Sequence, residues 1–223
     1  MSTYLLALPG IQTVTPTFLR GLVDLSARHG WDPNGIALVI SEESGFNPAA
    51  KNPNGSASGL IQFIESTANR LGTTTAQIRA MTAEQQLPLV ERFFASTLGR
   101  KIPQQIEDYV LASFGQANLI GAPDSTVMFA AGSPEYAANQ TFDSNGKGAI
   151  TVGDVRAHMR AVLSHANGVV EVPDSSYAFE LVSSPKKPEG APVLATIAVL
   201  GMTAIAGYVA WNRNVFRRSH PMH

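Results

Sequence analysis

Two short stretches decide the fold of this chain: IALVISEESGFNP at residues 36–48 and GLIQF at residues 59–63. In the first stretch, three apolar residues and Glu43 recur at the spacing of one helix face. The apolar members of this face are Ile36, Val39 and Ile40. The pattern predicts a helix with a carboxyl group on its apolar side. On spacing alone, Glu43 could instead stand at the helix end and simply reach solvent.

A carboxyl group on an apolar face can perform chemistry that an exposed one cannot. Removal from water raises the pKa of a carboxyl group and keeps it protonated near neutral pH. A protonated acid can pass its proton to the leaving group of a bond that breaks. Glu43 is therefore the candidate general acid. Glu42 precedes it but lies off the apolar face.

Helix signals run through residues 15–165, with little of the alternation that strands show. Thr15-Pro16 and Asp32-Pro33 each combine an N-cap residue with a proline in the first turn. The run Thr82-Ala83-Glu84-Gln85 fits a capping box. A further helix is expected over residues 60–71, ending at Gly72, after a loop at residues 51–59. The fold class is therefore expected to be mainly α.

Composition excludes several classes of protein. The chain has 223 residues, with 16 Lys and Arg against 17 Asp and Glu. This balance gives no support to nucleic-acid binding, and no nucleic-acid partner is expected. Cysteine is absent, which excludes disulfides, cysteine zinc sites and thiol nucleophiles. The five histidines are scattered without metal-ligand spacing, so zinc is not expected either.

The C-terminal end holds a long segment without charge. Residues 191–211 read APVLATIAVLGMTAIAGYVAW, and as a helix they would span about 30 Å, the thickness of a bilayer core. We expect a single transmembrane helix there, a linker at residues 166–190 and a basic tail at residues 212–223. The alternative is a buried core helix, although buried helices are usually shorter.

The N-terminal residues give a different indication. Residues 1–10, MSTYLLALPG, have no basic segment and only a very short apolar run, so they do not resemble a secretory signal. Membrane anchoring is therefore expected to depend on the C-terminal helix. The catalytic domain is expected over residues 1–165.

The two motifs together closely resemble the lytic transglycosylase family, over about residues 15–160. The resemblance rests on Glu43-Ser44-Gly45-Phe46-Asn47-Pro48, a loop of Asn, Gly and Ser, and then Gly59-Leu60-Ile61-Gln62-Phe63. These enzymes have a lysozyme-like fold related to goose-type lysozyme and cleave peptidoglycan strands. The second half resembles the version found in bacteriophages, through Thr67-Ala68, Leu71-Gly72 and the run from Ser133 to Asn139.

The resemblance implies roles for individual residues. Glu43 would protonate the glycosidic oxygen between MurNAc and GlcNAc, and then act as base on the MurNAc C6 hydroxyl to close a 1,6-anhydro ring. No metal or organic cofactor is implied. A tyrosine late in the family's domain faces the catalytic Glu, and Tyr136 is the candidate here, although Asn139 follows it by three residues where the family has an adjacent Asn. The residues implied to contact substrate are Ser44, Gly59, Leu60, Ile61, Gln62 and Tyr136.

Residues 143–154 resemble a calcium-binding loop. Asp143, Asn145 and Asp154 are the candidate ligands. However, Lys147 occupies a position that normally supplies an oxygen, and Asp154 replaces the usual Glu. The alternative is a turn followed by a capping box at Thr151–Asp154.

These inferences combine into one expected function with two alternatives. The chain is expected to be a virion-associated lytic transglycosylase that aids delivery of a phage genome into the host. Its partners would be peptidoglycan glycan strands, a membrane through the C-terminal helix, and other virion proteins. It would be located in the virion and then in the host cell envelope. The alternatives are a lysozyme-type hydrolase of the same fold, and a structural virion membrane protein whose lysozyme-like domain only binds glycan.

Overall fold

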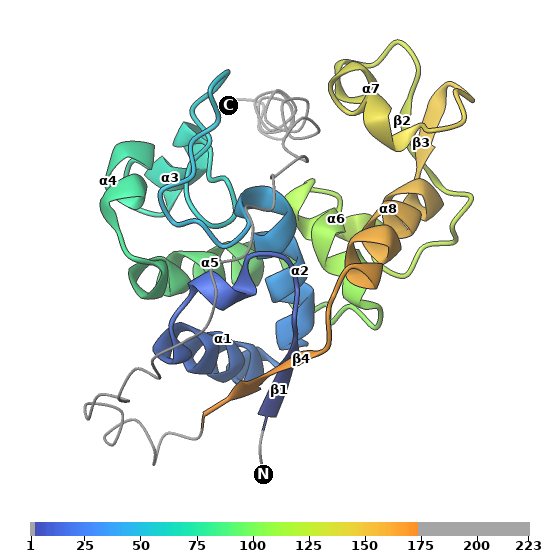
Figure 1. Ribbon diagram of the computed structural model, residues 1–223. Coiled ribbons are helices and arrows are strands. Elements are labelled where there is room, and N and C mark those ends of the chain that lie inside the picture. Colours follow the sequence, from blue (N-terminus) through green and yellow to red (C-terminus); the bar gives the residue numbers. More distant parts are fainter. Residues whose placement is uncertain (1–2, 174–223) are drawn as a thin grey trace, which may run out of the picture.

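The computed structural model describes residues 3–173, which form a mainly helical fold with two small sheets (Figure 1). The α-helices are α1 (Pro16–His29), α2 (Pro33–Ser44), α3 (Glu65–Arg70), α4 (Thr75–Ala80), α5 (Ala83–Leu98), α6 (Tyr109–Ser113), α7 (Pro134–Ala138) and α8 (Val152–Ser164). The strands are β1 (Thr3–Leu6), β2 (Val127–Ala130), β3 (Ala149–Thr151) and β4 (Val169–Val172). Four short 3-10 helices are η1 (Ile11–Thr13), η2 (Ile106–Asp108), η3 (Ala117–Leu119) and η4 (Gln140–Phe142). The expectation of a mainly α fold is confirmed.

Helix α2 runs through the middle of the molecule and contacts α1, α6 and α8 (Figure 1). The Asp32 side chain caps its first turn by accepting from the Asn34 N–H at 2.8 Å, and Gly45 ends it in the left-handed conformation. All five residues 36–40 are fully buried. A sequence that is apolar almost all round is typical of a helix that is covered on several sides, as α2 is.

Three predicted helix starts are confirmed by their side-chain bonds. Thr15 accepts from Phe18 N–H at the start of α1, and Pro16 is the first helical residue. Asp32 and Pro33 open α2 in the same way. Thr82 and Gln85 form the predicted capping box of α5.

The helix expected over residues 60–71 is wrong in its first half. Residues 60–64 form turns, and α3 begins only at Glu65. Ser58 and Phe63 pair through two backbone hydrogen bonds of 3.0 and 2.9 Å, which fold the chain back on itself. Gln62 has a positive φ of 49°, which a helix does not allow.

Strands β1 and β4 pair in antiparallel fashion at the lower edge of Figure 1, with Thr3 opposite Val172 and Leu6 opposite Val169. Leu5 is fully buried and Val172 is 1% exposed, so the pair packs on the helices. The sequence predicts a linker over residues 166–190, whereas residues 169–172 form β4 and pair with β1.

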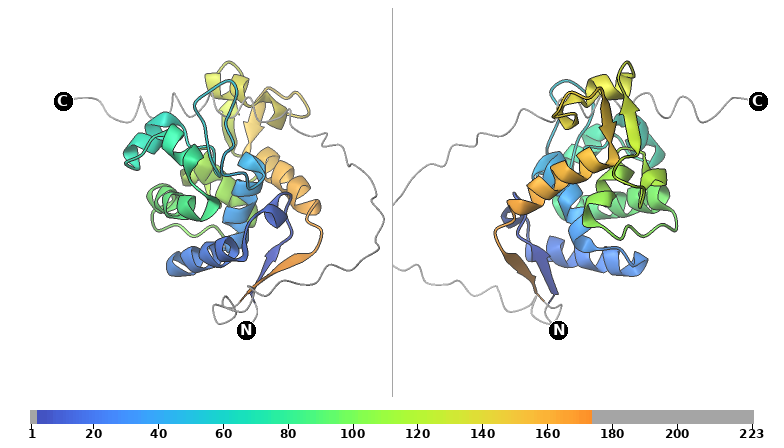
Figure 2. Two further views of the ribbon diagram at one scale, coloured as in Figure 1. Left: turned by 60° about the vertical axis from the view of Figure 1, so that its left-hand side comes forward. Right: turned by 90° about the vertical axis from the view of Figure 1, so that its right-hand side faces the viewer.

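A small lobe built from β2, β3, α7 and η4 lies beyond α8, and both views of Figure 2 show it projecting from the helical body. Arg156 of α8 secures the connection to this lobe. Its guanidinium donates to both carboxylate oxygens of Asp108, at 2.7 and 3.0 Å, and to Asp124 at 2.6 Å. Arg156 and Asp108 are almost fully buried, so this ion pair fixes α8 against η2.

Within residues 3–173 no helix is both long enough and apolar enough to cross a membrane. The predicted transmembrane helix at residues 191–211 and the basic tail at 212–223 lie outside the described residues.

Candidate active site

Glu43 lies in the last turn of α2, on the buried side of the helix. Its side chain is 5% exposed, and the apolar residues on the same face, Ile36, Val39 and Ile40, are fully buried. The predicted carboxyl group on an apolar face is therefore confirmed, and the solvent-facing alternative is wrong. The carboxyl group of Glu43 is therefore largely removed from solvent.

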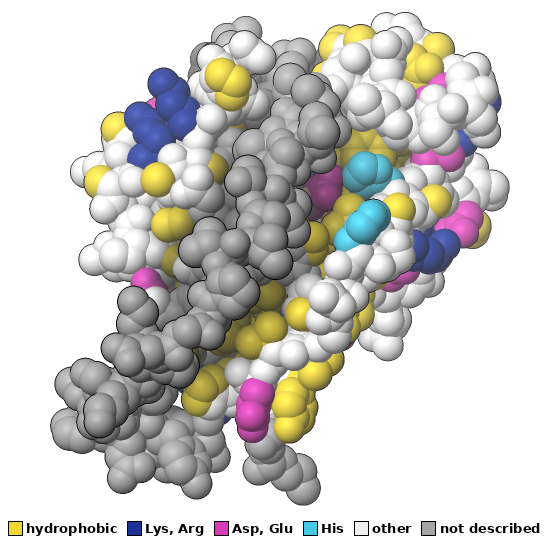
Figure 3. Space-filling model, viewed as in Figure 1, with side chains coloured by type: hydrophobic (Ala, Val, Ile, Leu, Met, Phe, Trp, Pro, Cys, Tyr) yellow, Lys and Arg dark blue, Asp and Glu magenta, His cyan; other side chains and the backbone are white. Residues whose placement is uncertain are grey.

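Glu42 has a different environment from its neighbour. Its Oε1 lies 3.0 Å from His158 Nε2 of α8, and its side chain is 27% exposed. The His158 ring also packs on Phe142, with the ring centroids 4.8 Å apart. Histidine and acidic side chains lie next to each other near the middle of the face shown in Figure 3. Glu42 therefore lies off the buried face of α2 and connects this helix to α8.

Ser44 joins the two sequence motifs. Its hydroxyl lies 2.8 Å from the Leu60 carbonyl, to which it donates, and 3.1 Å from the Ile40 carbonyl of its own helix. This contact places the turn that begins at Gly59 directly against the C-terminal end of α2. One side-chain hydrogen bond thus connects two motifs that are separated in the sequence.

The second motif forms a tight turn. Gly59 has a φ of +80°, and the Gln62 amide nitrogen donates to the Gly59 carbonyl at 3.0 Å. Leu60, Ile61 and Gln62 are each at most 5% exposed. These side chains are therefore packed inside the protein. Their direct contact with substrate stays a prediction.

Gln86 of α5 holds this turn and was not assigned a role from the sequence. Its side chain is fully buried, and its carbonyl oxygen accepts from Leu60 N–H at 2.8 Å. Its amide nitrogen donates to the carbonyls of Pro48 and Ile78 at 2.8 and 2.9 Å. A Cβ at Gly59 would lie 2.5 Å from the Gln86 oxygen, which explains the glycine there. The only signal in the sequence was an amide among apolar neighbours on a helix.

The N-terminal segment supports the end of α2 from the other side. The Ser41 hydroxyl donates to the Pro9 carbonyl at 2.9 Å. A Cβ at Gly10 would lie 2.2 Å from the Gly45 carbonyl oxygen, so the two backbones are in direct contact. This contact joins residues far apart in sequence, and no local pattern indicates it.

Tyr136 lies in α7, and its hydroxyl donates to Asp143 Oδ2 at 2.7 Å. This hydrogen bond raises the pKa of Tyr136. The Asp143 carboxylate also accepts from the backbone N–H groups of Lys147 and Gly148, at 3.0 and 2.8 Å. Burial alone would raise the pKa of Asp143, but these hydrogen bonds hold it below its usual value. The predicted approach of Tyr136 to Glu43 is not tested by these contacts and stays a prediction.

The candidate calcium loop has its oxygen atoms engaged by protein donors. Lys147 pairs with Asp154, and the Asn145 side chain accepts from Lys147 N–H at 3.3 Å. Thr151 and Asp154 form the capping box of α8, which confirms that part of the alternative interpretation. Among the described residues, no group of three or more His, Cys, Asp or Glu is placed to hold a metal ion.

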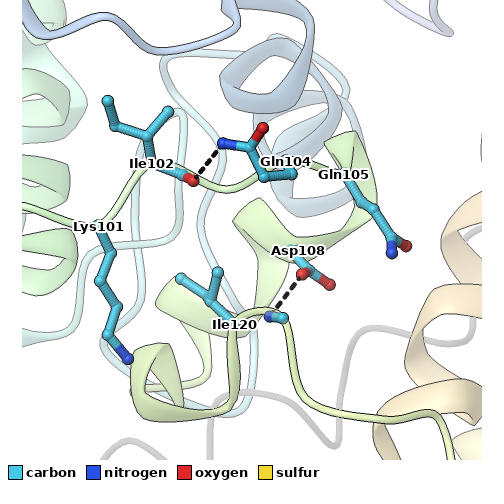
Figure 4. Close-up of a pocket in the computed structure, with 7 residues that line it drawn as sticks. Lys101, Ile102, Gln104, Gln105, Asp108 and Ile120 are labelled. Carbon is cyan, nitrogen blue, oxygen red and sulfur yellow. Dashed lines mark hydrogen bonds between the residues drawn. The ribbon is translucent and has the colours of Figure 1, made fainter.

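A cavity of about 320 Å³ lies between the loop after α5 and the segment around Ile120 (Figure 4). Asp108 reaches it, but its carboxylate accepts from Gly121 N–H at 3.0 Å and is paired with Arg156. Gln104 donates to the Ile102 carbonyl at 3.1 Å. The acid at this cavity is neutralised by a buried cation, so the cavity offers no second catalytic carboxyl.

Residues 24–86 match the family model of the transglycosylase SLT domain. The matched range contains Glu43, Ser44 and the Gly59–Gln62 turn, and it makes this part of the chain similar to that domain. Tyr136 and residues 143–154 lie outside the match. No curated protein matches the chain.

Proposed function

We propose that this chain is a lytic transglycosylase that cleaves the β-1,4 bond between MurNAc and GlcNAc in peptidoglycan. The observation that carries the proposal is the buried carboxyl of Glu43 at the end of α2, joined through Ser44 to the Gly59–Gln62 turn. Both motifs fall inside the range that matches the transglycosylase SLT domain.

The proposed reaction uses one carboxyl group twice. Glu43 gives its proton to the glycosidic oxygen as the bond from that oxygen to C1 of MurNAc breaks. The resulting carboxylate then takes the proton of the MurNAc C6 hydroxyl, and O6 bonds to C1 to form the 1,6-anhydro ring. Glu43 ends protonated, as it began, with the proton taken from the C6 hydroxyl, and no water is consumed. Glycosidases that use water generally need a second carboxyl group beside the first.

Digestion of purified peptidoglycan, followed by mass spectrometry of the released fragments, tests this proposal. A transglycosylase leaves 1,6-anhydro ends, which are lighter by one water than the reducing ends that a hydrolase leaves. Reducing ends would favour the lysozyme-type hydrolase. Binding of glycan without any released fragment would favour a structural protein.

The proposal extends to a role in phage particles. The support is the phage-like pattern around Thr67-Ala68 and Leu71-Gly72, together with the apolar segment at residues 191–211. The enzyme would be carried in the virion, be anchored by that segment, and open the host wall during genome delivery. Detection of the chain in purified particles by mass spectrometry tests this role. Its absence from particles that contain their other proteins would contradict it.

A further inference from the structure

The last turn of α2 is held in place by the neighbours of Glu43 in the sequence. Ser41 binds the N-terminal segment, and Ser44 binds the second motif. Glu42 makes a third contact, with His158 of α8. A helix turns about 100° per residue, so these three side chains leave the turn in different directions. The turn that carries the candidate acid is therefore held by three separate parts of the fold.

The contact between Glu42 and His158 is a hydrogen bond of ordinary length. Glu42 Oε1 and His158 Nε2 are 3.0 Å apart, and because a carboxylate oxygen accepts, the ring nitrogen is the donor. Both side chains are partly exposed. A pair of this kind contributes little to the free energy of unfolding. Its effect is therefore expected on the position of the helix end more than on stability.

His158 is itself held by contacts other than Glu42. Helix α8 lies beside α2 (Figure 1), and its Arg156 binds the buried Asp108 at 2.7 Å, two residues before His158. The His158 ring packs on Phe142 of η4, with the ring centroids 4.8 Å apart. Phe142 in turn packs on Phe114, with the centroids 5.5 Å apart. Since the ring is anchored independently of α2, it determines where the Glu42 carboxylate lies.

We propose that His158 is a positioning residue for the reaction, and that it acts through Glu42 to hold the carboxyl group of Glu43 where its proton must be transferred. A general acid must lie within hydrogen-bond distance of the atom that it protonates. A displacement of about 1 Å can lower the rate about a hundredfold. His158 transfers no proton itself. This inference rests on the proposed function, because it assigns a supporting residue to the same reaction.

The test compares His158→Ala and His158→Gln in the full chain, with soluble peptidoglycan strands as substrate. Alanine removes the contact with Glu42, so kcat should fall about tenfold. KM should stay unchanged, because the Gly59–Gln62 turn is not altered. Glutamine supplies an amide N–H in place of the ring N–H and should restore most of kcat.

A double-mutant cycle tests whether His158 acts through Glu42. Glu42→Ala should lower kcat about as much as His158→Ala does. The variant with both changes should lose no more than either single variant, because the two side chains act through one contact. Additive losses would overturn the assignment to this contact.

His29→Ala is the matched control. His29 Nε2 lies 2.9 Å from Glu91 Oε1, and the exposure of this pair is similar to that of His158 and Glu42. The control pair links α1 to α5, and His29 precedes Asp32, which caps the start of α2, at the end opposite Glu43. His29→Ala and His158→Ala should each lower the melting temperature by a few degrees at most. Only His158→Ala should lower kcat.

Three outcomes would contradict the inference. Unaltered kcat in His158→Ala, or a loss that His158→Gln does not restore, would overturn the positioning role and leave the proposed function intact. An equal loss of kcat in His29→Ala would show that the loss follows from general destabilisation, and would also overturn that role alone. An unaltered chain that releases no fragments from peptidoglycan would instead overturn the proposed function, and this inference with it.

Discussion

Glu42 and Glu43 are the same residue type, joined by one peptide bond, and they have different environments. A helix turns about 100° per residue, so consecutive side chains point to different sides. Glu43 is directed to the buried side and is 5% exposed, whereas Glu42 reaches His158 at 3.0 Å. The helix geometry therefore selects which of the two carboxyl groups is taken out of water.

We predict that Glu43→Gln removes cleavage and leaves the fold intact. Glutamine keeps the size of the side chain but has no proton to transfer, and general acid catalysis contributes roughly a hundred- to ten-thousandfold. Glu42→Gln should change the rate far less, since it alters only a partly exposed pair worth about 1 kcal/mol or less. Fragment release and thermal unfolding of both variants check this. Loss of activity in Glu42→Gln alone would contradict the assignment.

Tyr136→Phe separates the observed contact from the predicted one. The variant loses the hydroxyl that donates to Asp143, so the melting temperature should fall. The pKa of Tyr136 is raised in the fold, so this stabilisation is complete below about pH 10 and is lost as pH rises through the higher folded value. The predicted substrate contact requires a higher KM as well. A lower melting temperature with an unchanged KM would show that Tyr136 acts only within its lobe.

Gly10 is a second residue whose effect can be predicted. In Gly10→Ala the new Cβ would lie 2.2 Å from the Gly45 oxygen at a φ of +89°. Left-handed backbone costs alanine about 1–2 kcal/mol, and the overlap adds roughly 1–3 kcal/mol. We expect lower stability and a lower turnover number, because the displaced Gly45 follows the catalytic helix.

Gly72→Ala is the matched control for this change. Gly72 has a similar φ of +77°, but a Cβ there meets nothing within 4 Å. Thermal unfolding and turnover should show a stability loss of about 1–2 kcal/mol and unaltered turnover. Equal loss of turnover in both variants would argue against a role for the Gly10–Gly45 contact.

At the scale of elements, the turn at residues 59–62 depends on α5. Gln86 satisfies one backbone N–H and two carbonyls from three other segments, all by one side chain. A helix over residues 60–71 would require helical backbone geometry from Leu60 onward. The contact between Gln86 and Leu60 and the pairing of Ser58 with Phe63 hold these residues in a turn instead. Tertiary contacts therefore override the local helix preference.

Gln86→Glu should destabilise the protein by about 2–4 kcal/mol. It replaces the amide donor by an acceptor, which leaves the Pro48 and Ile78 carbonyls without their donor and places a carboxyl in a fully buried position. Gln85→Glu is the control, because the exposed Gln85 belongs to a capping box in which Glu can take the same role. This change should alter the free energy of unfolding by no more than about 0.5 kcal/mol. Denaturant unfolding measures both. Similar stabilities would show that the Gln86 contacts contribute little.

At the scale of the whole molecule, β1 and β4 bring the two ends of the described chain together. The pair is extended by Ala7 N–H to the Gly168 carbonyl at 3.0 Å. Arg20 of α1 donates to the Pro173 carbonyl at 3.0 Å. The folded unit therefore continues past the boundary that composition suggested at residue 165.

We predict that a chain ending at residue 173 folds and remains active, because it retains every described element. A chain ending at residue 165 loses β4 and leaves the backbone groups of β1 unpaired, so its melting temperature should be lower by several degrees. Thermal unfolding and peptidoglycan digestion compare the two. Equal melting temperatures would contradict a structural role for the β1–β4 pair.

The sequence by itself determined the helices whose ends carry their own signals, and the candidate acid. Thr15, Asp32 and Thr82 cap through bonds to residues two or three positions away, so a local pattern contains them. The burial of Glu43 likewise follows from the apolar face that it shares. These features depend on neighbours within one or two helical turns.

Only the tertiary structure decided how the second motif folds and where the domain ends. Gln86 lies 26 residues from Leu60, and β1 pairs with a strand at the opposite end of the described chain. Gly10 meets Gly45 through a close approach of two backbones. Such contacts form because a buried polar group must find a partner wherever the packed chain supplies one. A local sequence pattern does not specify which distant residue this is.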